Sequence, residues 1–483
     1  MKKIIYILCI TIGFSFLSCE DLEMLQEKPK YDAVETFTTN ASRVESVILS
    51  CYYQLRRDPG CSRIEQMENE TQADYNYGSG SYAYMSEYKG LDQTNITRIL
   101  DTWAILYRVV RFSNEILVLM NDAEMTTTER QELTGELHFL RALAYSRLVR
   151  HWGGVPLFDE SNWKELYEPR VSVDKMYEFI VSDLEYAEQN LPDKEKQYGR
   201  PCKLAAKTML CEMYLYQQRW ADARDKALEV INAGRYALVP VSTSDDYYKI
   251  FGPDVNGTSE EIFYIKYNTQ SGSMFAWMCH TTGTNYINPT QGPMGLYSLA
   301  SNQFISTWSN SDLRKSFNLY DRTVSGIARK LCKKFIDPDQ TGPTTSNDNP
   351  LYKYSDLLLY YAEAAARANN APTADAMEKL NMIHRRAYGK NPLSPNALVD
   401  YKLSDYNSLN SFIDLVLKER GYETYCEGKR YIDLVRCGKL AEKVKYAKGI
   451  DITSDAAYWW PIPDMEFLHN PYFDVDKDQN PGY

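Results

Sequence analysis

The sequence has few of the residues and motifs on which most catalytic and metal sites depend. Only five histidines occur in 483 residues, and none has the H-E-x-x-H spacing of a zinc-binding helix. There is no C-x-x-C pair for a zinc knuckle or a thioredoxin-like site. A G-x-S-x-G turn for a nucleophilic serine and a Walker loop are missing as well. We therefore expect no metal, no cofactor and no enzymatic activity.

Paired carboxylates leave one enzymatic alternative open. A glycoside hydrolase needs two acids that flank the bond to be broken, and Asp245-Asp246 and Glu260-Glu261 are adjacent acid pairs. Because neighbouring side chains on a strand point to opposite faces, these pairs are poor candidates for that role. The sequence favours binding over catalysis, with a glycoside hydrolase as the less favoured reading.

Long apolar runs are also scarce, and the one that is present lies at the N-terminus. Lys2 and Lys3 precede an apolar segment, residues 4–17, which ends at Ser18-Cys19. This pattern predicts a signal peptide over residues 1–18 and a lipid anchor on Cys19. An ordinary secretory signal with an incidental Cys19 is the alternative. No second apolar run reaches membrane-spanning length, so we expect the rest of the chain to lie outside the bilayer.

The negative net charge narrows the choice of partners further. The formal charge is −11, and it becomes more negative when Lys2 and Lys3 leave with the signal peptide. Nucleic acid is therefore a poor candidate partner, and a neutral ligand is easier to accommodate.

Most of the cysteines left after removal of the signal peptide are expected to be buried and to act as small apolar residues. Cys51 with Cys61 is the one pair worth testing for a disulfide.

Helical periodicity covers most of the chain outside its middle. Apolar residues recur at three-and-four spacing over residues 98–119, 128–151, 174–190 and 203–216. Two segments, residues 205–228 and 354–387, place small residues on two helices around a short turn, as tetratricopeptide units do. We expect a helical part over residues 19–235, an irregular loop-rich insertion with short β-strands over 236–349, and a second helical-repeat part over 350–483.

Aromatic residues are abundant in the two irregular stretches. The chain has 39 tyrosines and eight tryptophans, more than a core of this size needs. A pyranose ring presents an apolar C–H face that an aromatic ring can support, while nearby polar groups meet its hydroxyls. Residues 70–95 and the insertion supply that mixture. The candidate ligand-binding residues are Asp74, Tyr75, Asn76, Tyr77, Tyr82, Tyr84, Trp277, Asn285, Tyr286 and Tyr297.

Packing is the alternative role for every one of these aromatic residues. Loop tyrosines often pack against their own backbone, so each of them has a structural reading beside the binding one. Trp103 and Trp308 lie in strongly apolar helical contexts, and we expect both in the core.

Several short strings occur in a fixed order from the lipid box at Cys19 to the last residue. They are Trp152-Gly153-Gly154-Val155-Pro156-Leu157, Ser259-Glu260-Glu261-Ile262-Phe263, Asp312-Leu313-Arg314, Asp356-Leu357-Leu358-Leu359, Glu419-Arg420, Glu427-Gly428-Lys429-Arg430, Asp433-Leu434-Val435-Arg436 and Gln479-Asn480-Pro481-Gly482-Tyr483. No single string needs to be unique for the ordered set to be specific. Together they resemble the SusD/RagB family of outer-membrane nutrient-binding lipoproteins from Bacteroidetes.

The resemblance implies a fold and a function. Such proteins have a mostly α fold, with tetratricopeptide-type helix pairs forming a scaffold. They sit on the outer membrane facing outward and bind a glycan on an aromatic platform built from loops. They deliver it to a TonB-dependent SusC-like barrel. RagB-like members are associated with peptides, so a peptide ligand is the alternative.

Charged residues near the C-terminus alternate in sign at helical and turn spacing, which predicts buried or half-buried ion pairs between helices rather than a ligand site. These residues are Glu419, Arg420, Glu427, Arg430, Asp433 and Arg436.

Overall fold

The structure is a computed structural model that describes residues 38–58, 60–253, 255–268, 295–324, 326–338 and 345–483. The predicted signal peptide and Cys19 lie outside these residues. Within the described ranges, no helix is both long enough and apolar enough to span a bilayer.

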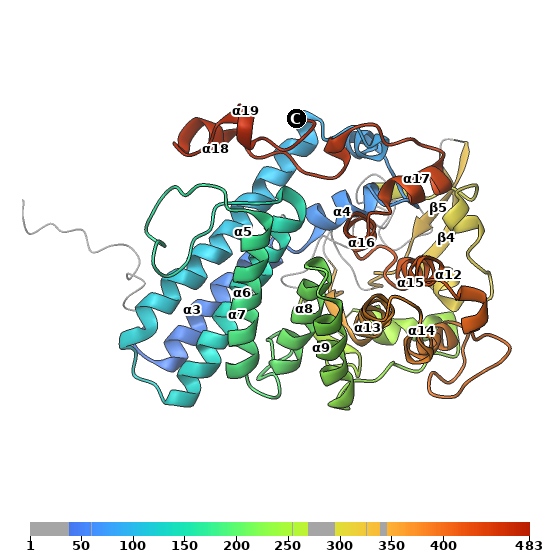
Figure 1. Cartoon of the computed structure of the whole chain (residues 1–483), viewed down its shortest axis with the longest axis horizontal. Helices are drawn as coiled ribbons and strands as arrows, with labels where there is room; N and C mark the ends of the chain where they lie inside the picture. The colour runs from blue at the N-terminus through green and yellow to red at the C-terminus, as the bar shows by residue number, and fades with distance from the viewer. Residues whose placement is uncertain (1–37, 59, 254, 269–294, 325, 339–344) are drawn as a thin grey trace, which may run out of the picture.

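Long helices that pack side by side make up the N-terminal part of the scaffold (Figure 1). Helix α5 packs on α3 and α6, and α7 packs on α6 and α8. The helices of this part, within the described residues, are α3 (Ala41–Arg56), α4 (Arg63–Thr71), α5 (Gln93–Leu119), α6 (Thr127–Trp152), α7 (Val173–Asn190), α8 (Lys203–Tyr216) and α9 (Trp220–Asn232).

Local signals fix both ends of the long helix α6. Thr126 and Glu129 form a reciprocal capping box at its start, and the helix ends at Gly153 with φ of 74°. A side chain on the next residue, Gly154, would place its Cβ 2.0 Å from the carbonyl oxygen of Val171. The chain can therefore turn back only because both positions lack a side chain.

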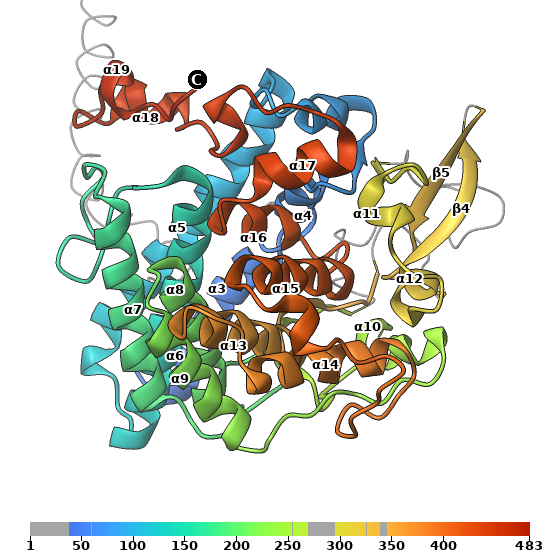
Figure 2. The same ribbon diagram turned by 45° about the vertical axis from the view of Figure 1, so that its right-hand side comes forward.

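Two helix pairs have the repeat-like arrangement predicted from their small residues. Helices α8 and α9 are joined by a short turn, and Ala223 and Ala227 of α9 are fully buried. The second pair joins α13 (Tyr354–Ala368) to α14 (Ala374–Ala387), and α13 also packs on α9. Figure 2 shows α13, α14 and α15 grouped together. The prediction of a mostly α fold with tetratricopeptide-type pairs is confirmed.

The remaining helices are short or belong to the C-terminal segment. They are α10 (Tyr248–Phe251), α11 (Gln303–Ser306), α12 (Leu313–Asn318), α15 (Leu409–Glu423), α16 (Arg430–Arg436), α17 (Leu440–Lys448), α18 (Asp464–His469) and α19 (Val475–Asp478).

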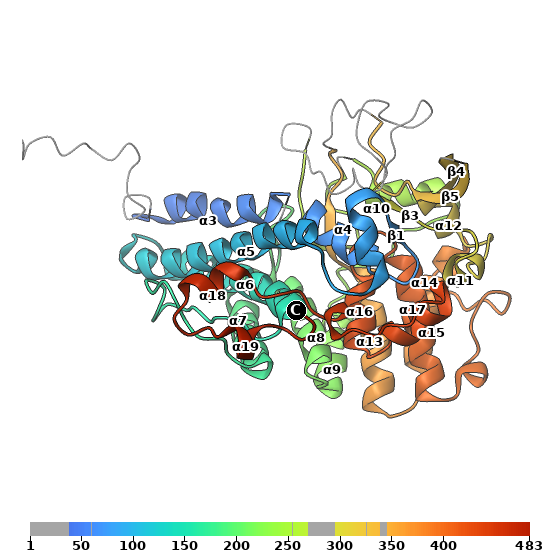
Figure 3. The same ribbon diagram turned by 90° about the horizontal axis from the view of Figure 1, so that it is seen from above.

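Short antiparallel strand pairs occupy the middle of the chain. Strand β1 (Tyr77–Gly78) pairs with β3 (Leu296–Tyr297), β2 (Glu261–Ile265) with β6 (Asn349–Lys353), and β4 (Leu319–Val324) with β5 (Ile327–Cys332). Seen from above, β1, β3, β4 and β5 lie on one side of the scaffold, and α13, α14 and α15 extend toward the other (Figure 3). The strand pairs thus place the predicted loops on one side of a helical body.

The charged residues near the C-terminus form ion pairs in the core, as predicted. Arg420 donates to Asp433 at 2.8 Å, and Arg436 donates to both oxygens of Glu363 at 2.8 and 2.7 Å. All four side chains are buried. These charge-assisted contacts join α15 and α16 to α13.

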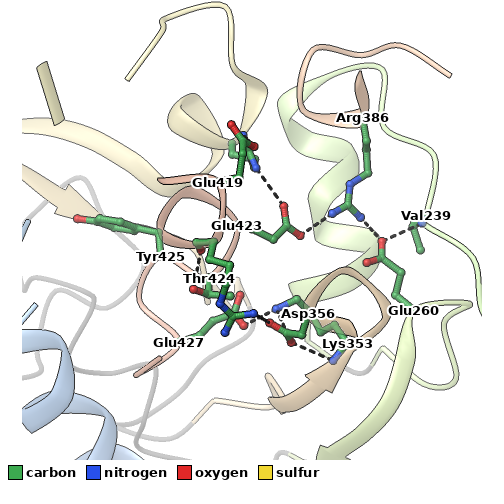
Figure 4. Close-up of polar contacts among 12 residues, drawn as sticks. Val239, Glu260, Lys353, Asp356, Arg386, Glu419, Glu423, Thr424, Tyr425 and Glu427 are labelled. Carbon is green, nitrogen blue, oxygen red and sulfur yellow. Dashed lines mark hydrogen bonds and ion pairs between the residues drawn. The ribbon is translucent and has the colours of Figure 1, made fainter. Parts of the chain in front are cut away.

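A second group of ion pairs surrounds Arg386 of α14. Figure 4 shows its guanidinium between Glu423 and Glu260, and it donates to both. Burial raises the pKa of Glu260 to about 7. Burial also acts to raise the pKa of Glu423, but Arg386 and Arg314 overcome that effect and lower it to about 2. One cation therefore holds the insertion, through Glu260, against the C-terminal repeat helices.

Replacing Arg386 with Met should destabilise the protein strongly. The change leaves two buried carboxylates without their shared cation, and breaking a buried pair in this way costs about 3–5 kcal/mol. Chemical denaturation at pH 7 measures the free energy of unfolding.

The control is Arg224→Met. Arg224 pairs with Asp225 on the surface, where both side chains are well exposed, so we expect a loss of about 0.5 kcal/mol or less. Equal losses in the two variants would contradict the assigned role of Arg386.

Candidate functional site

Pairing of β1 with β3 brings the two predicted ligand loops together. Tyr77 lies opposite Tyr297 in the register, and the Ser79 amide donates to the Gly295 carbonyl at 2.9 Å. The two tyrosine rings stack with centroids 5.6 Å apart and an angle of 19° between their planes. Two aromatic residues from distant parts of the sequence therefore form one stacked pair.

Cations support this ring pair. The Arg329 guanidinium lies 4.1 Å from the centroid of Tyr297, and the Lys448 ammonium lies 4.8 Å from that of Tyr77. Both tyrosines are half-buried. Cation–π contacts hold each ring in place and put hydrogen-bond donors next to it. The arrangement suits a ligand that has both an apolar face and hydroxyl groups.

The short 3₁₀ helix at Gly80–Glu87 carries the next two candidates. Tyr84 has 37% of its surface exposed and is open to a ligand. Tyr82 is largely buried, and the Arg98 guanidinium lies 3.9 Å from its ring centroid. Tyr84 thus offers an exposed ring on this helix, whereas Tyr82 braces the loop.

Asp74, Tyr75 and Asn76 require a correction, because the structure places all three in the core. Asp74 forms an ion pair with Arg430, and the Tyr75 ring packs between Phe304 and Tyr425. The side-chain amide oxygen of Asn76 accepts hydrogen bonds from the hydroxyls of Ser298 and Tyr425.

These three residues are buried because their segment packs in the core below the Tyr77–Tyr297 ring pair. Its side chains fasten the loop to the C-terminal helices and are almost fully buried. The other candidates Trp277, Asn285 and Tyr286 lie outside the described residues.

Lys448 is a site residue that sequence reasoning missed. It ends α17, and its ammonium donates to the Tyr88 hydroxyl at 2.7 Å besides contacting the Tyr77 ring. Burial lowers the pKa of Lys448 to about 7, and Asp74 opposes the shift only in part. The only local signal is Gly449, the left-handed residue that caps α17, and it does not indicate what Lys448 contacts.

Metal and thiol chemistry are not indicated for this site. In the parts of the chain that the structure describes, no group of three or more His, Cys, Asp or Glu side chains is placed to hold a metal ion. Cys51 and Cys61 are both free and buried, and burial raises the pKa of each thiol to about 12. The suggested disulfide is therefore not formed in this structure.

The adjacent acid pairs considered for a glycosidase have structural contacts. Glu260 faces Arg386 and accepts from the Val239 amide, whereas Glu261 pairs with Lys266. The two carboxylates thus point to different partners, as expected for neighbours on a strand.

Fold and site together define a helical-repeat binding protein with an aromatic surface built on loops. Residues 23–215 match the family described as "Starch-binding associating with outer membrane". Residues 318–483 match the SusD family. The chain belongs to the SusD/RagB family, and the prediction from the sequence strings is confirmed.

The sequences of known SusD-like proteins match this chain over most of its length. SusD-like protein P25 of Formosa agariphila is 24% identical, with 99% of each chain covered. A SusD-like protein of Bacteroides ovatus is also 24% identical, with 88% of this chain and 81% of the relative covered.

Solved structures establish the fold. A SusD homolog from Bacteroides thetaiotaomicron has a TM-score of 0.79 at 20% identity, covering 94% of this chain and 99% of that one. Surface glycan-binding protein A from the same organism, solved in complex with laminarihexaose, has a TM-score of 0.72 at 21% identity. It covers 92% of this chain and 100% of its own.

The depressed pKa of Lys448 predicts a pH-dependent stability. Its folded pKa of about 7 lies below the value of about 10.4 for a free lysine. Between these values the unfolded chain binds more protons, so the free energy of unfolding should rise with pH from about 7 to 9. Lys448→Met should flatten that rise.

Denaturation at pH 6, 7, 8 and 9 tests the assignment. Lys445→Met is the control, because Lys445 lies on the same helix, is exposed and pairs with Asp451. A rise of the same slope in Lys448→Met and in the unmodified protein would contradict the prediction.

Proposed function

We propose that this protein is a lipid-anchored, cell-surface member of the family that binds a glycan and delivers it to a TonB-dependent SusC-like outer-membrane barrel. The family descriptions support the location and the ligand class. The glycan complex of a protein with the same fold supports the ligand class as well. The observation that carries the proposal is the stacked pair of Tyr77 and Tyr297.

The chemistry of the ring pair matches an oligosaccharide. Stacked phenol rings support the C–H face of a pyranose, and the edges of the rings carry hydroxyl groups. Arg329 and Lys448 add donors that can reach sugar hydroxyls. Tyr84 offers a further exposed ring on the neighbouring 3₁₀ helix. Trp277, Asn285, Tyr286 and the partly buried Tyr82 remain proposed contributors by region.

The protein is proposed to bind its glycan without converting it. Glu260 and Glu261 are engaged by Arg386 and Lys266, and Asp246 is engaged by Lys249. Hydrolysis of a glycosidic bond requires a free general acid and a second carboxylate on the other side of the bond. Binding without turnover suits a protein that passes its ligand to a transporter.

Removing a ring of the pair should weaken binding and leave the fold intact. Loss of one stacking ring is worth roughly 1–3 kcal/mol, which corresponds to about a fivefold to hundredfold loss of affinity. We expect Tyr77→Ala and Tyr297→Ala each to show this effect in calorimetric titration with an oligosaccharide selected on a glycan array. Their melting temperatures should hardly change.

Two controls separate binding from stability. Tyr53→Ala removes an exposed tyrosine of α3 and should change neither quantity. Trp103→Ala removes a buried ring, lowers the melting temperature and leaves the affinity per folded molecule intact. Chromatography of the titrated oligosaccharide should return it unchanged. Normal affinity in both ring-pair variants would refute the site, and new products would refute the binding role.

The lipid anchor is tested by Cys19→Ala. The thiol at the cleavage junction is the proposed acylation point, and acyl chains hold a protein at a membrane at roughly 0.8 kcal/mol per buried methylene. The variant should appear in the soluble fraction without a lipid mass. Acylated Cys19→Ala protein in the membrane fraction would show that the anchor lies elsewhere.

A further inference from the structure

A cleft of about 450 Å³ lies on the C-terminal side of the molecule, between α11, α15 and α17. Its volume is in the range of small-molecule sites. The residues that line this α15–α17 cleft are Asp74, Phe304, Thr307, Tyr406, Ser411, Asp414, Leu415, Lys418, Tyr422, Arg430, Glu442, Lys443 and Tyr446.

Aromatic rings form much of the cleft wall. Tyr422 is held from behind by Trp308, whose ring stacks on it at 4.4 Å, and from the side by Phe304 at 4.8 Å. Tyr446 has 58% of its surface exposed and Tyr406 is half-buried. The cleft therefore has one rigid aromatic wall and two further rings that keep accessible faces.

The charged groups of the cleft balance one another, with one exception. Asp74 pairs with Arg430 at 2.8 Å. Asp414 pairs with Lys443 at 3.0 Å, and Glu442 pairs with Lys443 at 2.7 Å and with Lys439 at 2.8 Å. Each carboxylate that lines the cleft already has a cation.

Lys418 is the exception. Its ammonium lies over the rings of Tyr401 and Tyr422, at 5.7 and 5.9 Å from their centroids. No carboxylate among the described residues lies within 4.0 Å of it. Lys418 is half-buried, so an anion that reached it would be partly screened from water and more strongly attracted.

We propose that the α15–α17 cleft is a second glycan subsite, which selects a negatively charged sugar residue through Lys418. The inference rests on the proposed glycan-binding function. Aromatic faces suit the pyranose ring, and Lys418, which has no carboxylate partner among the described residues, suits a carboxylate or sulfate group on it. A sugar ring fits this cleft better than a peptide, because the available faces are phenol rings and hydroxyls rather than backbone-pairing groups.

Helix α17 connects this cleft to the ring pair. Glu442, Lys443 and Tyr446 line the cleft, whereas Lys448 at the end of the same helix contacts Tyr77. Five residues of helix rise by about 7.5 Å, so the cleft and the ring pair are contacted by neighbouring turns of α17.

The test is an array that carries neutral, uronate-containing and sulfated oligosaccharides together with acidic peptides. The intact mature protein should bind charged oligosaccharides in preference to neutral ones of equal length. In titration with the best acidic oligosaccharide, Lys418→Met should lose about tenfold in affinity, as expected for one charge-assisted contact. Lys418→Arg should retain most of it. Tyr446→Ala should lose about fivefold, in the lower part of the range for a stacking ring.

Lys445→Met is the matched control, because it removes the same charge from exposed α17 surface outside the cleft. It should leave the affinity for the acidic oligosaccharide unchanged. An equal loss in Lys445→Met and Lys418→Met would show a general charge effect and overturn the proposal.

The outcomes distinguish this inference from the proposed function. If only neutral glycans bind, with a loss in Tyr77→Ala and none in Lys418→Met, the glycan-binding function stands and the acidic subsite is refuted. Acidic peptides that bind through Lys418, without any acidic glycan, would also refute it. No binding to any glycan on the array would refute both proposals.

Discussion

Opposite charges buried between sequence-distant segments are the constraint on which the rest of the structure depends. Glu427 accepts from Lys334 of the insertion at 2.6 Å and also from Lys353, which precedes α13. Arg430, which lies three residues after Glu427, pairs with Asp74 of the first loop. Removing these charges from water is costly, so each must be paired with an opposite charge. The ion pairs thereby fix how the first loop, the insertion and the C-terminal helices are placed relative to one another.

The candidate site is a consequence of that placement. The segment from Asp74 to Asn76 is anchored below the surface, and Tyr77, the next residue, emerges beside Tyr297. Strand β1 begins at Tyr77, and its pairing with β3 places this ring beside Tyr297. The polar residues under the rings therefore determine where the rings lie, although a ligand on the surface does not touch them.

Much of the fold could be predicted from the sequence, because periodicity and caps are local signals. The predicted helix over residues 203–216 coincides with α8, but α5 begins five residues before the predicted start, where Asp92 caps it. The charged strings were predicted as ion pairs from their alternating sign, and the structure bears this out. Burial of Tyr75 could not be predicted in the same way. Its depth depends on Phe304 and Tyr425, which lie far away in the sequence.

The contacts of Lys448 and Lys418 could not be predicted from the sequence either. Both are ordinary helical lysines in the sequence, and only the packed structure reveals that one lies over Tyr77 and the other has no carboxylate partner among the described residues. A residue type indicates what a side chain can do. Its surroundings decide whether the side chain is available to do it.

The pairing of two-residue strands across the chain also has a consequence for folding. Strand β1 precedes α5, whereas its partner β3 follows α10. Contacts between residues so far apart in sequence form late, because the entropy of closing the intervening loop opposes them. A partly folded copy can therefore contain most of its scaffold helices and still lack the ring pair. The ring pair is therefore complete only when the whole chain has folded.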